Sequence, residues 1–107
     1  MFDPKIAVED PDDPDARHCL DAYYRELAAR FSEGFDPASH PLNVSDMRPP
    51  GGCFFIVRSA GAPVGCAALL RLDAATGELK RMWVAEAARG RGVGRRLLHH
   101  AEAERLG

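Results

Sequence analysis

The sequence predicts one α/β domain of the α+β type, with a sheet flanked by helices. Three apolar runs separated by short turns between residues 53 and 84 indicate an antiparallel meander. Apolar residues recur at helical spacing both before and after these runs. A chain of 107 residues with 46% apolar and 28% charged residues has the size and composition of one globular domain. We therefore expect residues 1–107 to form a single domain.

The first predicted elements are a short strand at Ile6–Val8 and a helix that follows an acidic segment. Asp13 and Pro14 suit the N-cap and the first helical position, and Gly34 suits the helix end. One helix face carries the apolar residues Leu20, Tyr23, Tyr24, Leu27, Ala28 and Phe31. We expect this face to pack in the core; the alternative is that the tyrosines reach a substrate.

Residues 35–52 are interrupted by prolines and glycines and predict an irregular connection with at most a short helix near Ser45–Arg48. Long connections in compact domains are commonly functional. If the protein is an enzyme, we expect residues of this segment to line part of its acceptor pocket.

Strands are predicted at Cys53–Arg58, Val64–Leu72 and Glu78–Val84, with turns at residues 59–63 and 73–77. Strict alternation would place the last strand's side chains on two faces. One face would hold Glu78, Lys80, Met82 and Val84, and the other Leu79, Arg81 and Trp83. A helix over Val93–Leu106 follows, with Val93, Leu97, Leu98 and Ala101 as its buried stripe.

Composition argues against several classes of protein. No apolar run approaches the roughly 20 residues of a membrane helix, and the acidic N-terminus does not resemble a signal peptide, so we expect a cytoplasmic protein. Three cysteines and four histidines lack the spacing of zinc ligands, so no metal is expected. Residues 1–36 hold ten acidic and four basic side chains, a balance of −6, whereas residues 78–107 hold seven basic and four acidic, a balance of +3.

The basic end contains the most informative motif, Arg89-Gly90-Arg91-Gly92-Val93-Gly94-Arg95-Arg96. Alternate glycines let a backbone approach a ligand, and a following helix directs unpaired amides at an anion. The nucleotide P-loop requires Lys-Ser or Lys-Thr after its last glycine, and the dinucleotide fingerprint requires G-x-G-x-x-G; neither pattern is present. A local anion cradle is favoured over nucleic-acid binding, because the net charge is −2 and no aromatic residues interleave the arginines. A plain tight turn with solvated arginines is the alternative.

Arg89, Gly92 and Gly94 fit R-x-x-G-x-G after an antiparallel meander, and here the sequence resembles the GNAT family of N-acetyltransferases. Residues 78–98 are similar to the family's acyl-coenzyme-A motif, and residues 63–67 resemble its third strand. The resemblance implies a three-layer, mainly antiparallel mixed sheet with flanking helices, in the order β-α-(α)-β-β-β-α. It also implies transfer of an acetyl group from acetyl-coenzyme A to an amine of a small molecule or peptide.

The resemblance also assigns roles to residues. It implies that the strand end binds the pantetheine arm, that the loop and helix start bind the pyrophosphate, and that Glu78 is the general base for direct attack by the amine. The implied cofactor-binding residues are Met82, Trp83, Val84, Arg89, Gly90, Arg91, Gly92, Val93, Gly94 and Arg95. The alternative for Glu78 is an ion-paired strand residue beside Lys80, and Cys66 is expected to pack rather than act as a nucleophile.

Members of the family continue past this helix into further strands, which the resemblance implies are missing after residue 107. We therefore expect the last strand to present an open edge, covered by an absent C-terminal segment or by a second copy in a homodimer. The expectation is weak coenzyme binding and poor turnover by these residues alone. The competing hypothesis is a non-catalytic GNAT-like fragment or coenzyme-A-binding module.

Overall fold

The structure, a computed structural model, describes residues 2–30, 44–73 and 76–106. Four strands form one sheet in the order β1-β2-β3-β4, and every pair is antiparallel. The strands are β1 (Lys5–Glu9), β2 (Gly52–Ser59), β3 (Ala62–Arg71) and β4 (Gly77–Val84). The helices are α1 (Pro14–Arg30) and α2 (Val93–Leu106), with 3-10 turns η2 (Val44–Met47) and η3 (Glu86–Ala88). The predicted α+β order is confirmed, while Phe31 and Gly34 lie outside the described residues.

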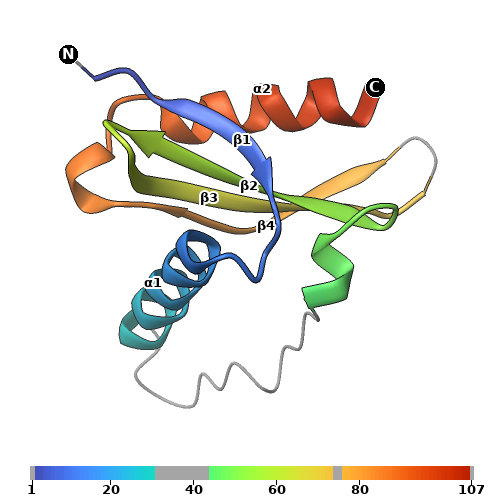
Figure 1. Ribbon diagram of the computed structural model, residues 1–107, viewed down its shortest axis with the longest axis horizontal. Helices are drawn as coiled ribbons and strands as arrows, with labels where there is room; N and C mark the ends of the chain where they lie inside the picture. The colour runs from blue at the N-terminus through green and yellow to red at the C-terminus, as the bar shows by residue number, and fades with distance from the viewer. Residues whose placement is uncertain (1, 31–43, 74–75, 107) are drawn as a thin grey trace.

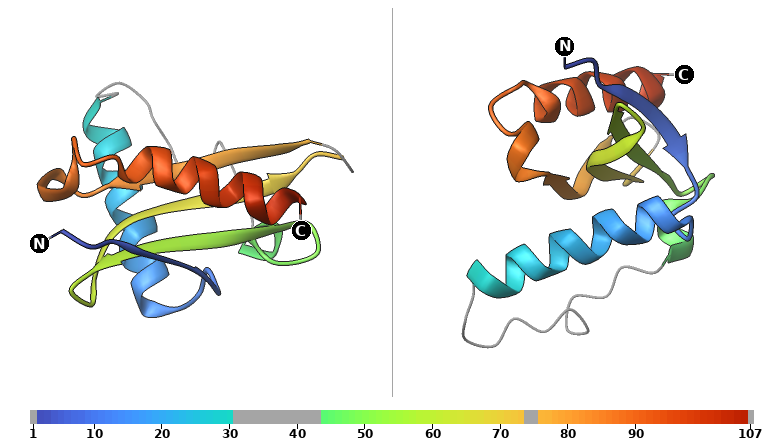
Figure 2. Two further views of the ribbon diagram at one scale, coloured as in Figure 1. Left: turned by 90° about the horizontal axis from the view of Figure 1, so that it is seen from above. Right: turned by 60° about the vertical axis from the view of Figure 1, so that its left-hand side comes forward.

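The two helices cover opposite faces of the sheet and create three layers (Figure 1). The views in Figure 2 show α2 on one face and α1 crossing the other. Side chains of β2 alternate between these faces: Phe54 and Ile56 pack toward α1, whereas Phe55 and Val57 pack toward α2. All four are fully buried, which explains why β2 reads as a continuous apolar run.

Two ion-pair groups hold α1 and the segment before it, one against the sheet and the other against the end of η2. Arg58 of β2 donates to Glu9 of β1 and to Asp15 in the first turn of α1. Arg48, after η2, donates to Asp10 and Asp12. The hydrogen bond from Arg48, with a smaller contribution from the Asp12 amide, lowers the pKa of Asp10 from 3.8 to about 2.

A tight turn joins β2 to β3. Ala60 and Gly61 connect β2 to β3 and both have positive φ, which is the backbone conformation of a tight hairpin turn.

Leu98 was predicted to be buried, but its side chain is 46% exposed. The buried stripe of α2 is instead Val93, Leu97 and Ala101 at i, i+4 and i+8, which leaves Leu98 at the margin of the contact.

A candidate coenzyme site at the end of β4

The loop between η3 and α2 has the backbone conformation that its glycines allow. Gly90 and Gly92 both have φ of +79°, in a region that costs an L-residue roughly 1–2 kcal/mol. The carbonyl of Gly92 accepts a hydrogen bond of 3.1 Å from the Arg96 amide, which opens the helical ladder. The amides of the next three residues therefore have no carbonyl partner within α2 and point away from its positive end.

The start of α2 packs directly against the end of β4. A Cβ added to Gly94 would lie 3.8 Å from the sulfur of Met82. On β3, a Cβ at Gly65 would lie 3.1 Å from Val93 Cγ1 and 3.2 Å from the Trp83 carbonyl oxygen. The first turn of α2 therefore lies beside the end of β4, and Gly65 is the position where the packing is tight.

A β-bulge interrupts β4 just before this strand end. Ala68 pairs with Lys80 and Cys66 pairs with Trp83, so Arg81 and Met82 together oppose one residue of β3. Arg81 has φ of +58°, which is unusual for a residue with a side chain. The bulge inserts one residue into the alternation and changes the face of everything after it.

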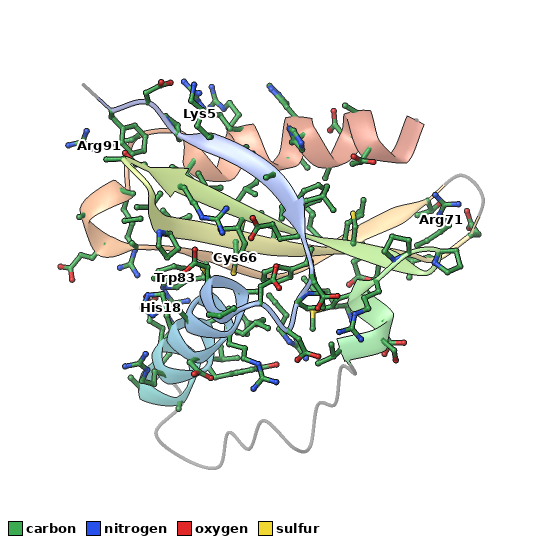
Figure 3. All side chains as sticks on the ribbon, viewed as in Figure 1. Lys5, His18, Cys66, Arg71, Trp83 and Arg91 are labelled. Carbon is green, nitrogen blue, oxygen red and sulfur yellow. The ribbon has the colours of Figure 1, made fainter. Side chains whose placement is uncertain are left out.

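The bulge makes the predicted alternation of β4 wrong. Leu79 was placed on the same face as Trp83, but Leu79 packs in the cluster under α2 and Trp83 in the cluster under α1. Val84 was placed with Glu78 and Met82, but it packs beside Leu79. Trp83 consequently faces α1 on the same side of the sheet as Cys66, and its ring packs edge to face against His18 of α1 (Figure 3).

A cleft of about 340 Å³ lies between α1 and the end of β4. It brings together four residues that the sequence assigned to the coenzyme, Met82, Trp83, Val84 and Arg89, with Tyr23, Glu26, Leu27 and Arg30 of α1. Glu26 was not predicted as a site residue, whereas Tyr23 fits both alternatives given for its helix face, because it packs against the core cluster and also lines the cleft. A sequence signal did exist, since Tyr23, Leu27 and Arg30 share one helix face, but the same spacing also describes a core stripe.

Glu26 connects the cleft's two walls. Its Oε2 accepts a 2.8 Å hydrogen bond from Trp83 Nε1 and a second bond from the Arg89 guanidinium. The Nε of Arg89 donates to the Val84 carbonyl oxygen at 3.0 Å. Arg89 therefore ties α1 to the end of β4, and its side chain remains 47% exposed.

The other arginines of the motif lie around the helix start. Arg91 stacks over the ring of Phe2 at 5.0 Å, at the opposite end of the molecule from Arg71 (Figure 3). Arg95 is exposed on the first turn of α2. The amide cradle and these guanidinium groups make this end of the molecule suited to a pyrophosphate.

Glu78 lies apart from the cleft-lining residues. It is opposite Leu70 near the start of β4, four residues or roughly 13 Å along the strand from Met82. Its Oε1 lies 3.7 Å from Lys80 Nζ in an exposed ion pair. Proton transfer from an amine in the cleft to Glu78 would therefore have to pass through a chain of water molecules.

Cys66 is fully buried, and its thiol donates to the Arg81 carbonyl oxygen at 3.3 Å. The neighbouring Cys19 thiol and burial raise the pKa of Cys66, so it is a protonated donor and not a thiolate nucleophile. This agrees with its predicted packing role.

Among the described residues, no group of three or more His, Cys, Asp or Glu side chains is placed to hold a metal ion. Within the same residues, no helix has both the length and the apolar character needed to cross a bilayer.

The sequence profile of the acetyltransferase (GNAT) family matches residues 20–106. The chain belongs to the GNAT family. This match includes α1 from Leu20 onward, the meander, the glycine-arginine loop and α2, and it confirms the resemblance found in the sequence.

Individual GNAT relatives agree with this assignment. The chain is 38% identical over 86 residues to an IAA acetyltransferase of Azospirillum brasilense, a match that covers 79% of this chain and 52% of that protein. The chain thus spans about half the length of the curated relative it matches.

Solved structures show the same GNAT fold. An acetyltransferase of the GNAT family from Staphylococcus aureus MU50 has a TM-score of 0.69 at 21% identity, covering 92% of this chain and 63% of that one. An aminoglycoside 6'-N-acetyltransferase complexed with coenzyme A has a TM-score of 0.70 at 20% identity, covering 95% and 55%. At these identities the likeness concerns the fold.

Proposed function

We propose that this GNAT chain binds acetyl-coenzyme A at the start of α2 and the end of β4, and that it contributes to acetyl transfer to an amine. The observation that carries the proposal is the juxtaposition of the open amides of residues 93–95 with Met82 and the cleft. The amides and Arg91 would bind the pyrophosphate, and the strand end at residues 82–84 would bind the pantetheine arm.

The chemistry needs no residue of the protein as a nucleophile. An amine held in the cleft attacks the thioester carbonyl carbon, the C–N bond forms, the C–S bond breaks, and the thiolate leaves and is protonated. Positioning of the two reactants supplies much of the rate. Glu78, acting through water, is our proposed base for the proton lost from the amine.

The acceptor is a small molecule or a peptide amine. Tyr23 and Trp83 offer aromatic surface in the cleft, and Arg30 and Glu26 offer charges of both signs. Radiolabelled acetyl-coenzyme A and a panel of amines test the proposal: labelled product above the background without protein supports it. No product with any amine, despite coenzyme binding, would favour the second candidate.

The second candidate is a coenzyme-A-binding module that does not catalyse transfer. Two observations favour it: the cleft carboxylate Glu26 is already paired with Arg89 and Trp83, and Glu78 lies outside the cleft-lining set. Coenzyme binding without acetyl transfer is the result that this candidate predicts. The open edge of β4 remains the proposed contact for a further segment or a second copy.

A further inference from the structure

The bulge in β4 is held from both sides by interactions of Arg81. Its Nε donates to the hydroxyl of Tyr24 at 3.2 Å, and its guanidinium lies 5.8 Å from the Tyr23 ring centroid and 5.7 Å from that of Tyr24. The two rings pack edge to face at 5.4 Å, so α1 presents them as a fixed pair. On the backbone side, the buried thiol of Cys66 donates to the Arg81 carbonyl oxygen.

These contacts stabilise an unfavourable backbone conformation at Arg81. Arg81 has φ of +58°, in the region that glycine adopts readily and other residues adopt only when their surroundings hold them there. A residue without such contacts would tend to return to an extended conformation. The two-against-one pairing opposite β3 would then be lost, and Met82 and Trp83 would shift relative to the loop.

We propose that Arg81, held by Tyr24, is a positioning residue for the acetyl-transfer site, and that the pair fixes the β-bulge that aims residues 82–84 into the cleft. This rests on the proposed function for its catalytic consequence, but its structural part stands independently. The pair connects α1, which forms one wall of the cleft, to β4, which forms the other. It therefore sets both the strand conformation and the spacing of the walls.

The variants Arg81→Ala and Arg81→Gly separate the clamp from the backbone conformation. Alanine loses the contacts and keeps the penalty of positive φ, whereas glycine loses the contacts but adopts positive φ without that penalty. By NMR of the full chain, we expect the amides of residues 80–84 to exchange with solvent at least tenfold faster in Arg81→Ala. In Arg81→Gly, we expect a clearly smaller increase.

Tyr24→Phe is a milder variant, because it keeps the ring and removes only the hydroxyl that accepts from Arg81. We expect it to raise exchange at residues 80–84 by about threefold, while Tyr23→Phe, which keeps its ring beside Arg81, changes exchange there less than Tyr24→Phe. If Arg81→Ala does not fold, this comparison still decides the proposal. Equal exchange in Tyr24→Phe and the wild type would overturn it.

Acetyl transfer provides the second readout. A positioning role predicts that Arg81→Ala lowers kcat at least tenfold and raises the KM for acetyl-coenzyme A by a smaller factor, because residues 82–84 shift while the loop at residues 90–95 is intact. It also predicts partial recovery of kcat in Arg81→Gly. If Arg81→Ala and Arg81→Gly have the same exchange rates and the same kcat as each other, the Arg81 side chain does not act by holding the positive φ at this position. If the wild type transfers no acetyl group, the proposed function fails, while the exchange measurements still test the clamp.

Discussion

The glycines of the motif have separable roles at the residue scale. Gly90 and Gly92 are required by their positive φ, whereas a Cβ added to Gly94 would make only an ordinary contact, 3.8 Å from the Met82 sulfur, and the backbone there has no positive φ. Gly65 is required by crowding, because a methyl group there would approach both Val93 and the Trp83 carbonyl. A repeated residue type in one sequence motif thus answers to different physical constraints.

Gly92→Ala tests the requirement for positive φ in the loop. No atom obstructs an added Cβ, so the variant should fold, but the positive φ should cost about 1 kcal/mol of unfolding free energy. Shifting the amides of residues 93–95 should weaken coenzyme A binding about tenfold, equivalent to ~1.4 kcal/mol. Calorimetry and chemical denaturation measure the two effects. Gly51→Ala, at an equally open position with no positive φ, is the control, and equal affinities in the two variants would contradict the cradle.

Glu78→Gln tests the proposed base. Loss of a general base typically lowers turnover by roughly 10²–10⁴-fold. The pH–rate profile should change with it, since the group proposed to accept the proton is gone. Glu102→Gln, an exposed change on α2, should leave the profile unaltered. A wild-type profile in Glu78→Gln would remove the residue from the mechanism and direct attention to Glu26.

At the scale of elements, α1 is the part whose role the sequence least revealed. Its periodicity correctly predicted a helix, but a single apolar stripe does not distinguish core from cleft wall. Leu20 is buried, while Tyr23 and Leu27, on the same stripe, line the cleft. The bulge in β4 could not be predicted from the sequence either, because residues 78–84 contain no glycine or proline to mark the irregular position.

The ion pairs before α1 make an element-scale prediction about acid stability. Asp10 has a pKa of about 2 in the folded state and 3.8 without its partners. A lowered folded pKa contributes stability that is complete above about pH 4 and is lost as the pH falls through about 2. Urea unfolding at several pH values should therefore show a smaller decline over this range in Asp10→Asn than in the wild type.

Asp21→Asn is the matched control for this change, because it removes an exposed carboxylate on α1. It should retain the wild-type decline between about pH 4 and 2. Asp10 and Arg48 are both near the surface, so raised salt should also reduce the contribution. Parallel pH curves for Asp10→Asn and the wild type would show that the pair does not couple to folding.

At the scale of the whole molecule, the predicted three-layer order follows from local patterns. Short turns fixed the meander, and its apolar runs required a helix on each face. The added β1–β2 pairing was not predicted, because Lys5–Glu9 must find a partner more than forty residues away and nothing local specifies it. The exposed side of β4 leaves one edge of the described sheet unpaired, next to the proposed site.

The most direct test of the account is an NMR titration with coenzyme A that follows the backbone amides of the whole chain. We predict the largest shifts at residues 90–95 and 82–84, with smaller shifts on α1 near Glu26. Pantetheine, which lacks the pyrophosphate, should shift residues 82–84 and leave residues 90–95 nearly unchanged. Saturating coenzyme A that leaves residues 90–95 unshifted, or that perturbs mainly the opposite end of the sheet near Arg71, would contradict the account.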